Sequence, residues 1–214
     1  MQRVAVVDYG GSNLRSVVKA IEHVADASFE VRVAQTAAEL RAADRVVFPG
    51  QGAIGDCMAH LLARDLVTAL RECVQEKPFF GICLGLQSLM SHSDEDGGTA
   101  CLDAYSGHVR RFPDNPGPAA DGSPRKIPHM GWNEVHWTRA HPVCAGVPSG
   151  TRFYFVHSYY VAPSDESIVL GCTDYILPFT SAIASGPAFA TQFHPEKSAA
   201  AGLQLLANFL RWKP

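Results

Sequence analysis

The chain has 214 residues, of which 47% are hydrophobic, so it can bury a substantial core, and its length predicts one domain spanning residues 1–214. Its 18 basic and 21 acidic residues give a formal net charge of -3 without a basic run, which argues against nucleic acid as a partner. The first apolar run ends after four residues, at Asp8, and is too short for a signal peptide. No later apolar run is long enough to cross a membrane.

The six cysteines are scattered and include no Cys-x-x-Cys pair, which argues against a zinc site and against a disulfide framework. We therefore expect no bound metal and a reducing, cytoplasmic setting. Five of the cysteines are expected to pack as small apolar residues: Cys57, Cys73, Cys101, Cys144 and Cys172.

Strand and helix patterns alternate in the first half of the chain. The spacing of apolar residues predicts strands at residues 3–7, 29–33 and 45–48 and helices at residues 14–24 and 37–42. One longer helical stripe, at about residues 56–75, then leads to an apolar strand that ends at Cys83. Because this order is typical of βαβ units, it predicts a parallel sheet.

The second half has a different character. Residues 91–98 are polar and residues 113–128 are rich in proline, glycine and aspartate, which predicts a surface loop within the domain. Strands are then predicted at residues 152–160, 168–173, 179–184 and 188–193, and a closing helix with one apolar face at residues 203–210. The whole pattern predicts an α/β fold, a single-domain, open and mostly parallel sheet flanked by helices, with a strand-rich second half.

Two glycine-containing turns follow predicted strands. Residues 8–13 could hold a phosphate at a helix amino terminus, although a tight turn capped by Ser12 or Asn13 is favoured. Residues 49–52, Pro-Gly-Gln-Gly, can present backbone N–H groups to a ligand at the carboxyl edge of the sheet, where open α/β sheets bind ligands. A flexible turn fits the second pattern equally well.

Cys83 stands in Gly-x-Cys-x-Gly, between a strand and a predicted helix. A strand that turns sharply into a helix needs small residues beside the turn, and Gly81 and Gly85 meet that need. A cysteine at the amino end of the helix meets free N–H groups and the helix dipole, which favour the thiolate. Cys83 is therefore the candidate nucleophile, although this motif alone fits a buried structural cysteine equally well.

A second motif favours the nucleophile. His194 and Glu196 offer a base and a carboxylate two residues apart, as a Cys-His-Glu arrangement requires. Either residue alone would more often be a structural histidine or a solvated charge. The two residues follow a predicted strand, and the sharp strand-to-helix turn at Cys83, called the elbow below, lies upstream. Cys83, His194 and Glu196 are therefore the predicted catalytic residues.

These motifs, at residues 49–52, 81–85 and 194–196, occur in the order shown by class I (triad) glutamine amidotransferases, which the chain resembles. Three further stretches resemble the glutaminase subunits of imidazole glycerol phosphate synthases: residues 8–14, 128–133 and 154–159. The similarity covers essentially the whole chain. Ser12, where that family usually has glycine, is one departure, and serine can also cap a helix.

The resemblance implies that the chain hydrolyses L-glutamine through a thioester on Cys83. His194 would act as acid and base, and Glu196 would orient it. The N–H of Leu84 is a natural oxyanion donor, and the resemblance implies further donors in the turn of Gln51 and Gly52. It also implies a glutamine pocket lined by Gly50, Gln87, His157, Ser158 and Tyr159, although the histidine and tyrosine also fit core strand positions.

The resemblance further implies a heterodimer with a (β/α)₈-barrel synthase subunit. That subunit would use the ammonia to make imidazole glycerol phosphate and an aminoimidazole carboxamide ribotide in histidine biosynthesis, so that the complex is a lyase. No cofactor is implied. The residues expected on the partner face are Asn13, Trp132, Tyr154 and Lys197, whereas His129, Met130 and Trp132 could also simply pack a loop.

Two alternatives remain open from the sequence. The chain could be the glutaminase subunit of another ammonia-using synthase, such as that for pyridoxal phosphate or anthranilate, but residues 128–133 argue against this. It could also be a redox sensor or binding module with an elbow cysteine and no hydrolytic activity. The pairing of His194 with Glu196 argues against that second alternative.

Overall fold

The computed structural model describes residues 1–10, 14–114, 117–118 and 125–214. Its helices are α1 (Arg15–Val24), α2 (Ala37–Ala42), α3 (Ile54–Ala63), α4 (Val67–Glu76), α5 (Leu84–Gln87) and α6 (Ala199–Arg211). Its strands are β1 (Gln2–Val7), β2 (Phe29–Ala34), β3 (Arg45–Gly50), β4 (Phe79–Cys83), β5 (His92–Ser93), β6 (Thr99–Ala100), β7 (Gly107–Arg111), β8 (His129–Trp137), β9 (Thr151–His157), β10 (Tyr159–Pro163), β11 (Val169–Asp174), β12 (Pro178–Ser185) and β13 (Ala188–Thr191). Ser12 and Asn13, predicted as capping and partner-face residues, lie outside the described residues.

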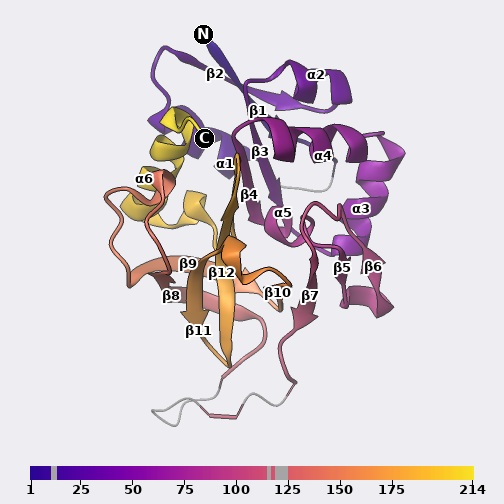
Figure 1. Cartoon of the computed structure of the whole chain (residues 1–214), viewed down its shortest axis with the longest axis vertical. Helices are drawn as coiled ribbons and strands as arrows, with labels where there is room; N and C mark the ends of the chain where they lie inside the picture. The colour runs from indigo at the N-terminus through magenta and orange to yellow at the C-terminus, as the bar shows by residue number, and fades with distance from the viewer. Residues whose placement is uncertain (11–13, 115–116, 119–124) are drawn as a thin grey trace.

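A single sheet runs through both halves of the molecule (Figure 1). Strands β2, β1, β3, β4 and β13 lie side by side and pair in parallel. From β13 onward the sheet continues through β12, β10 and β7 by antiparallel pairing. The predicted α/β fold, with helices beside a parallel sheet and a strand-rich second half, is confirmed.

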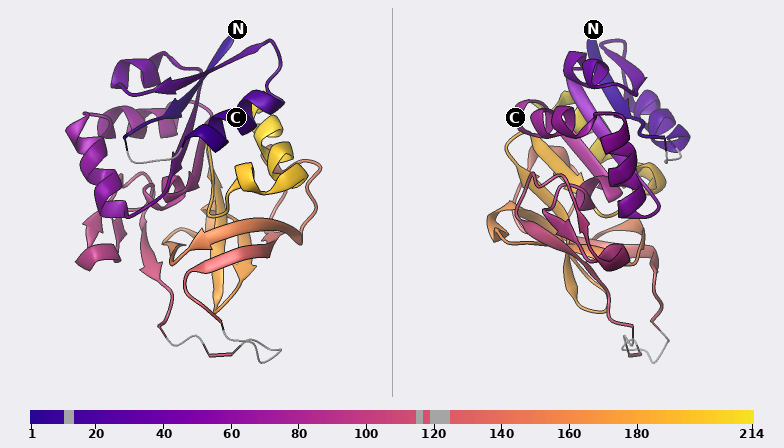
Figure 2. Two further views of the ribbon diagram at one scale, coloured as in Figure 1. Left: turned by 180° about the vertical axis from the view of Figure 1, so that it is seen from behind. Right: turned by 90° about the vertical axis from the view of Figure 1, so that its right-hand side faces the viewer.

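Alternate residues of the parallel strands face two separate cores. Val4 and Val6 of β1 pack with α1 and α6, whereas Ala5 and Val7 pack with α2, α3 and α4 on the other face. Successive strand side chains point to opposite faces, so each strand contributes to both layers. Both chain ends lie at the parallel end of the molecule (Figure 2).

Strands β8 and β9 form an antiparallel ribbon that crosses over the strands of the second half (Figure 2, left). Aromatic side chains fill the space beneath it. Phe153 of β9 stacks on Phe193 with ring centroids 4.1 Å apart, and Phe155 meets the edge of Phe179 at 5.9 Å. This packing fixes the ribbon over the segment that follows β13.

The single helical stripe expected at residues 56–75 is wrong, because the segment forms two helices, α3 and α4. Asp65 adopts a left-handed conformation with φ 55°. The N–H of Leu66 then donates to the carbonyl of Leu61 at 2.9 Å, which is the pattern of a helix carboxyl-terminal cap. Leu66 is fully buried, like Leu61 and Leu70, so the apolar spacing continues across a break in the backbone.

The single strand expected at residues 152–160 is also wrong. The chain bends at Ser158, whose carbonyl accepts from the N–H of Phe112, and β9 and β10 join different neighbours. Strand β9 pairs with β8, and β10 pairs with β7 and β12. Residues 129–137, for which no strand was predicted, form β8.

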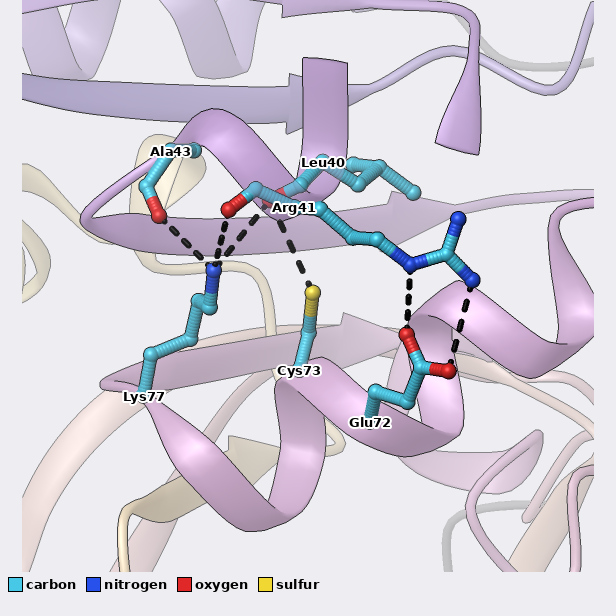
Figure 3. A network of polar contacts seen from close by, with 6 residues as sticks. All are labelled: Leu40, Arg41, Ala43, Glu72, Cys73 and Lys77. Atoms are coloured by element: carbon cyan, nitrogen blue, oxygen red, sulfur yellow. Dashed lines mark hydrogen bonds and ion pairs between the residues drawn. The ribbon is translucent and has the colours of Figure 1, made fainter. Parts of the chain in front are cut away.

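Lys77, directly after α4, closes the carboxyl end of α2 (Figure 3). Its Nζ donates to the carbonyls of Arg41 and Ala43, each at 2.9 Å, and to that of Leu40 at 3.5 Å. A cation at this end satisfies carbonyls that have no partner within the helix and opposes the helix dipole. The ion pair of Arg41 with Glu72, with Nε and Oε2 2.6 Å apart, joins the same two helices.

Replacing Lys77 by methionine removes these donors but keeps most of the side-chain volume. We expect the free energy of unfolding to fall by about 1–2 kcal/mol and the melting temperature by about 2–8 °C. Thermal unfolding followed by circular dichroism measures this, with Lys213→Met, an exposed lysine near the chain end, as the matched control. Equal melting temperatures of the two variants would contradict a capping role.

Candidate active site

Cys83 lies at a sharp turn between β4 and α5. Its φ of 54° is a left-handed conformation that a non-glycine residue rarely adopts. The neighbouring glycines are required by close packing. A Cβ on Gly85 would lie 1.8 Å from the carbonyl oxygen of Phe48 on the neighbouring strand, and one on Gly81 would lie 2.9 Å from the carbonyl oxygen of Gly85.

His194 and Glu196 follow β13, the strand that pairs in parallel with β4. His194 Nδ1 lies 2.8 Å from Glu196 Oε1, and their side chains are only 7% and 4% exposed, so this pair is shielded from water. The segment is fixed on both sides. The N–H of His194 donates to the carbonyl of Tyr154 at 3.0 Å, and the Ser198 hydroxyl donates to the carbonyl of His194 at 2.6 Å.

The charge state of His194 follows from its neighbours. Burial lowers the pKa of this imidazole, but Cys83 and the hydrogen-bonded Glu196 together outweigh burial and raise the pKa to about 10. The ring therefore carries its proton at neutral pH. Among the described residues, no hydrogen bond of ordinary geometry is made by Nε2 of His194. The ring nevertheless lies near enough to Cys83 for the sulfur to raise the pKa of the imidazole. This nitrogen is thus available to exchange a proton with a bound molecule.

The glycine turn after β3 lies beside the elbow, because Gly50 is directly opposite Cys83 in the parallel register of β3 and β4. Gly52 adopts a φ of 91°, and no atom lies within 4 Å of the place its Cβ would occupy. Leu84 is the first residue of α5, where a backbone N–H has no acceptor within the helix. Cys83, the turn and the amino end of α5 thus meet at one edge of the sheet.

A cavity of about 380 Å³ opens over these groups. Its lining residues are Gln51, Gly52, Cys83, Leu84, Gln87, Glu95, Pro128, Val156, His157, Ser158, Tyr159, His194 and Lys197. Gly50, expected in the glutamine pocket, is buried and does not line the cavity, since the side chain of Leu84 covers it. The other residues expected to bind glutamine or the oxyanion all line it.

Two residues near this cavity were missed from the sequence. Glu95 lies in the polar stretch 91–98, which resembles any solvated loop, yet its carboxylate reaches the cavity and accepts from the N–H of Ile54 at 2.9 Å. Burial raises the pKa of Glu95. Gln192 is fully buried between β13 and His194, and its Nε2 lies 3.6 Å from Cys83 Sγ. No spacing in the sequence indicated either contact.

The strand pair β8 and β9 presents an exposed apolar surface near the cavity. Met130 and Trp132 are 62% and 46% exposed. Trp132 meets the edge of Tyr154 with ring centroids 6.2 Å apart, and Lys197 Nζ lies 6.0 Å from the centroid of the Tyr154 ring. The surface formed by Met130 and Trp132 of β8, Tyr154 of β9 and the adjacent Lys197 is called the β8–β9 face below.

Neither a metal site nor a membrane span is found in the part of the chain that the structure describes. No group of three or more His, Cys, Asp or Glu side chains there is arranged to hold a metal ion. No helix there combines the length and the apolar character needed to cross a bilayer.

The family model for glutamine amidotransferase class-I matches residues 5–212. The chain is 56% identical to the imidazole glycerol phosphate synthase subunit HisH of Methylococcus capsulatus, over 100% of this chain and 98% of that protein. It is 54% identical to the subunit of the same name from Aromatoleum aromaticum, over 100% of both chains.

Solved structures share the fold at low sequence identity. A glutamine amidotransferase crystal structure matches with a TM-score of 0.70 and 18% identity, covering 97% of each chain. A putative GMP synthase subunit from Thermoplasma acidophilum matches with a TM-score of 0.69 and 18% identity, covering 99% of this chain and 93% of that one. By the family-model match and the full-length identity to HisH subunits, the chain belongs to the class I glutamine amidotransferase family, and within it to the HisH subunits of imidazole glycerol phosphate synthase.

Proposed function

We propose that the chain hydrolyses L-glutamine at Cys83 and delivers the ammonia to a synthase subunit that makes imidazole glycerol phosphate and aminoimidazole carboxamide ribotide in histidine biosynthesis. The observation that carries this proposal is the cavity that Cys83 shares with His194, whose ring is hydrogen-bonded to Glu196. The full-length similarity to HisH subunits supports the choice of pathway.

Amide hydrolysis begins with attack by the Cys83 thiolate on the side-chain carbonyl of glutamine. A carbon–sulfur bond forms, and the carbonyl electrons move onto oxygen. The N–H of Leu84 and those of the Gln51–Gly52 turn stabilise this oxyanion. His194, which is charged at neutral pH, gives its proton to the departing nitrogen, so that ammonia leaves and a γ-glutamyl thioester remains.

The second half of the cycle uses the same groups in reverse roles. Neutral His194 takes a proton from a water molecule while the oxygen of that water attacks the thioester carbonyl. The carbon–sulfur bond breaks, which regenerates the Cys83 thiolate, and the new carboxyl group loses its remaining proton to solvent as glutamate leaves. Glu196 holds Nδ1 of the ring throughout, which keeps Nε2 directed to the reacting atoms.

Glutamine recognition is assigned to the remaining polar groups of the cavity. Gln87, His157, Ser158 and Tyr159 line the wall next to Cys83, as the family resemblance implies. The carboxylate of Glu95 is a partner of the right charge for the α-ammonium group of glutamine. The hydrolysis needs no metal or cofactor, since the nucleophile, the proton carrier and the oxyanion donors all come from this chain.

The partner in this proposal is a (β/α)₈-barrel synthase subunit that forms a heterodimer with the chain. The β8–β9 face is the proposed centre of the contact, because exposed aromatic and aliphatic side chains near a catalytic cavity suit an interface that excludes water. Lys197 belongs to the same short segment as Glu196. A partner that contacts Lys197 can therefore displace or fix the segment that carries His194 and Glu196. Asn13, expected at this face, lies outside the described residues.

Replacing Trp132 by alanine is expected to weaken the complex by at least about 30-fold, equivalent to about 2 kcal/mol, since central aromatic residues dominate such interfaces. Isothermal titration calorimetry with the purified synthase subunit measures this. Val33→Ala is the matched control, because Val33 is 43% exposed and lies on the edge strand β2. An unchanged dissociation constant for Trp132→Ala would remove Trp132 from the proposed interface.

The remaining assignments rest on the same observations. One sheet through both halves supports a single amidotransferase domain of residues 1–214. All six cysteines are free thiols, which supports a reducing, cytoplasmic setting. We assign no role for nucleic acid or a membrane.

The function is tested by purifying the chain with the imidazole glycerol phosphate synthase subunit of its own organism. We expect glutamate release and glutamine-dependent formation of imidazole glycerol phosphate. Productive assembly with a pyridoxal phosphate or anthranilate synthase instead would replace the proposed pathway. Absence of glutamate release in every complex would favour the sensor or binding module.

A further inference from the structure

We propose that Gln192 is a positioning residue that donates a hydrogen bond to the sulfur of Cys83 and holds it in its reactive orientation. The Nε2 of Gln192 lies 3.6 Å from Cys83 Sγ. The inference rests on the proposed function, in which Cys83 is the nucleophile. It adds a fourth side chain, from the segment that directly follows β13, to the three that perform the hydrolysis.

The direction of this hydrogen bond is fixed by a main-chain carbonyl. The carbonyl of Tyr159 can only accept, so the Gln87 amide must present its nitrogen there, at 3.0 Å. The same nitrogen lies 3.2 Å from the Gln192 side chain. Two amide nitrogens facing each other would repel, so Gln192 presents Oε1 to Gln87. Its Nε2, and therefore its N–H groups, must then face Cys83.

The anchoring carbonyl is itself held in place. His157 Nδ1 donates to the Tyr159 carbonyl at 2.7 Å, and His157 Nε2 therefore accepts from His129 Nδ1 at 2.9 Å. Burial lowers the pKa of His157 to about 3 and that of His129 to about 4, so both rings are neutral and keep these tautomers. Two donors, from Gln87 and His157, thus converge on one oxygen.

Burial gives an independent reason to assign Gln192 a specific role. The residue has 0% exposure, and placing an amide in such a site is costly unless its polar atoms are paired. The hydrogen bonds of its side chain go to Gln87 and to Cys83. A leucine or methionine would fill the same space without that requirement. The amide is therefore better explained by the contact with sulfur than by packing.

A thiolate accepts a hydrogen bond more strongly than a neutral thiol, so this donor favours the attacking form. It also restricts rotation of the sulfur at a backbone position with φ 54°. His194 approaches the sulfur from the segment directly after Gln192. Gln192 and His194 therefore both reach the nucleophile from one stretch of chain.

The test compares Gln192→Met with the wild type in two measurements. The first is the rate of Cys83 alkylation by iodoacetamide in the free chain between about pH 5 and 9, followed by peptide mass spectrometry. The second is kcat and KM for glutamine in the complex with the synthase subunit. We expect the neutral-pH alkylation rate and kcat each to fall about ten-fold, the alkylation profile to move to higher pH, and KM to change less than about two-fold.

Thr191→Val is the matched control, because Thr191 is the fully buried neighbour and its hydroxyl donates to the carbonyl of Phe193 rather than to the cavity. This variant should keep the wild-type alkylation profile even if its melting temperature falls. If Gln192→Met does not fold, Gln87→Met retains Gln192 but removes the group that orients its amide. Because Gln87 also lines the proposed glutamine pocket, this variant is judged only by Cys83 alkylation, whose rate is expected to fall about three-fold.

Wild-type alkylation and an unmoved pH profile in folded Gln192→Met would overturn the proposal. That outcome differs from failure of the proposed function, which would appear as glutamine hydrolysis retained by Cys83→Ala. Alkylation of Cys83 in the free chain needs neither glutamine nor the synthase. The role of Gln192 can therefore be judged even if the proposed pathway is wrong.

Discussion

Replacing Cys83 by alanine is expected to abolish glutamine-dependent synthesis by the complex while leaving ammonium-dependent synthesis intact. Without the sulfur no thioester forms, and water alone meets a poor electrophile with a poor leaving group. A fall of at least about 10⁴-fold in glutamine turnover is expected, because removal of a nucleophile from such a set of groups has an effect of this order. The active site of the synthase subunit, where the ammonia is consumed in this proposal, has no part in that step.

The measurement is product formation with either glutamine or an ammonium salt at a pH high enough to supply free ammonia. Alanine at this position must still adopt φ 54°, so thermal unfolding should accompany the assay. Cys101→Ala is a suitable control, since this cysteine is also buried but lies outside the cavity lining. Substantial glutamine turnover by folded Cys83→Ala would exclude the thioester mechanism.

The sequence predicts the parallel half of the fold well, because each element there has a pattern tied to its burial. Residues 37–42 begin after Thr36, which caps α2 together with Glu39, and the helix has the expected bounds. Strands β1, β2 and β3 also form where the apolar runs indicated. In these segments local preference and tertiary burial agree, which is the condition for reliable prediction.

The two segments wrongly predicted as single elements share one physical cause, which is that apolar periodicity reports burial rather than backbone continuity. Leu66 stays buried although Asp65 ends α3, so the stripe crosses the break unchanged. Phe155 and His157 before the bend at Ser158 and Val161 after it are likewise all buried and all at odd-numbered positions, although Tyr159 between them is only partly buried. Side-chain spacing alone therefore cannot separate one long element from two short ones.

The candidate site was partly predictable for a related reason. Cys83 and His194 each stand in a local motif, but only the pairing of β13 with β4 brings them together, and no local pattern specifies that pairing. Glu95 and Gln192 have no motif of their own. Their contacts depend on groups in distant segments, the backbone N–H of Ile54, 41 residues from Glu95, and the sulfur of Cys83, 109 residues from Gln192.

Glutamine turnover by the free chain is expected to be slow and to rise about 100-fold to 1000-fold when the synthase subunit has bound its phosphorylated substrate. Hydrolysis without a partner wastes glutamine, and the turn after β3 offers a physical means of control. If the peptide between Gln51 and Gly52 rotates, either an N–H or a carbonyl faces the oxyanion. Loss of one oxyanion donor costs about 100-fold to 1000-fold in rate, which sets the expected range.

The surroundings of this turn restrict where rotation can occur. Gly50 is confined, because a Cβ there would lie 2.8 Å from Cβ of Leu84, whereas Gly52 has open space around it. Rotation is therefore expected at the Gly52 side, where glycine tolerates φ of either sign at little cost. Docking needs to favour the active orientation by only about 5 kcal/mol to shift the population almost completely.

The decisive comparison is glutamate release by the free chain, by the complex, and by the complex with synthase substrate bound. A stepwise increase would support the switch, and most of it should appear in the third state if the partner's ligand drives the rotation. A Trp132→Ala complex, held at a concentration that saturates binding, separates weaker docking from weaker signalling. If the three wild-type rates agree within about two-fold, far below the effect of one oxyanion donor, the turn is not a switch.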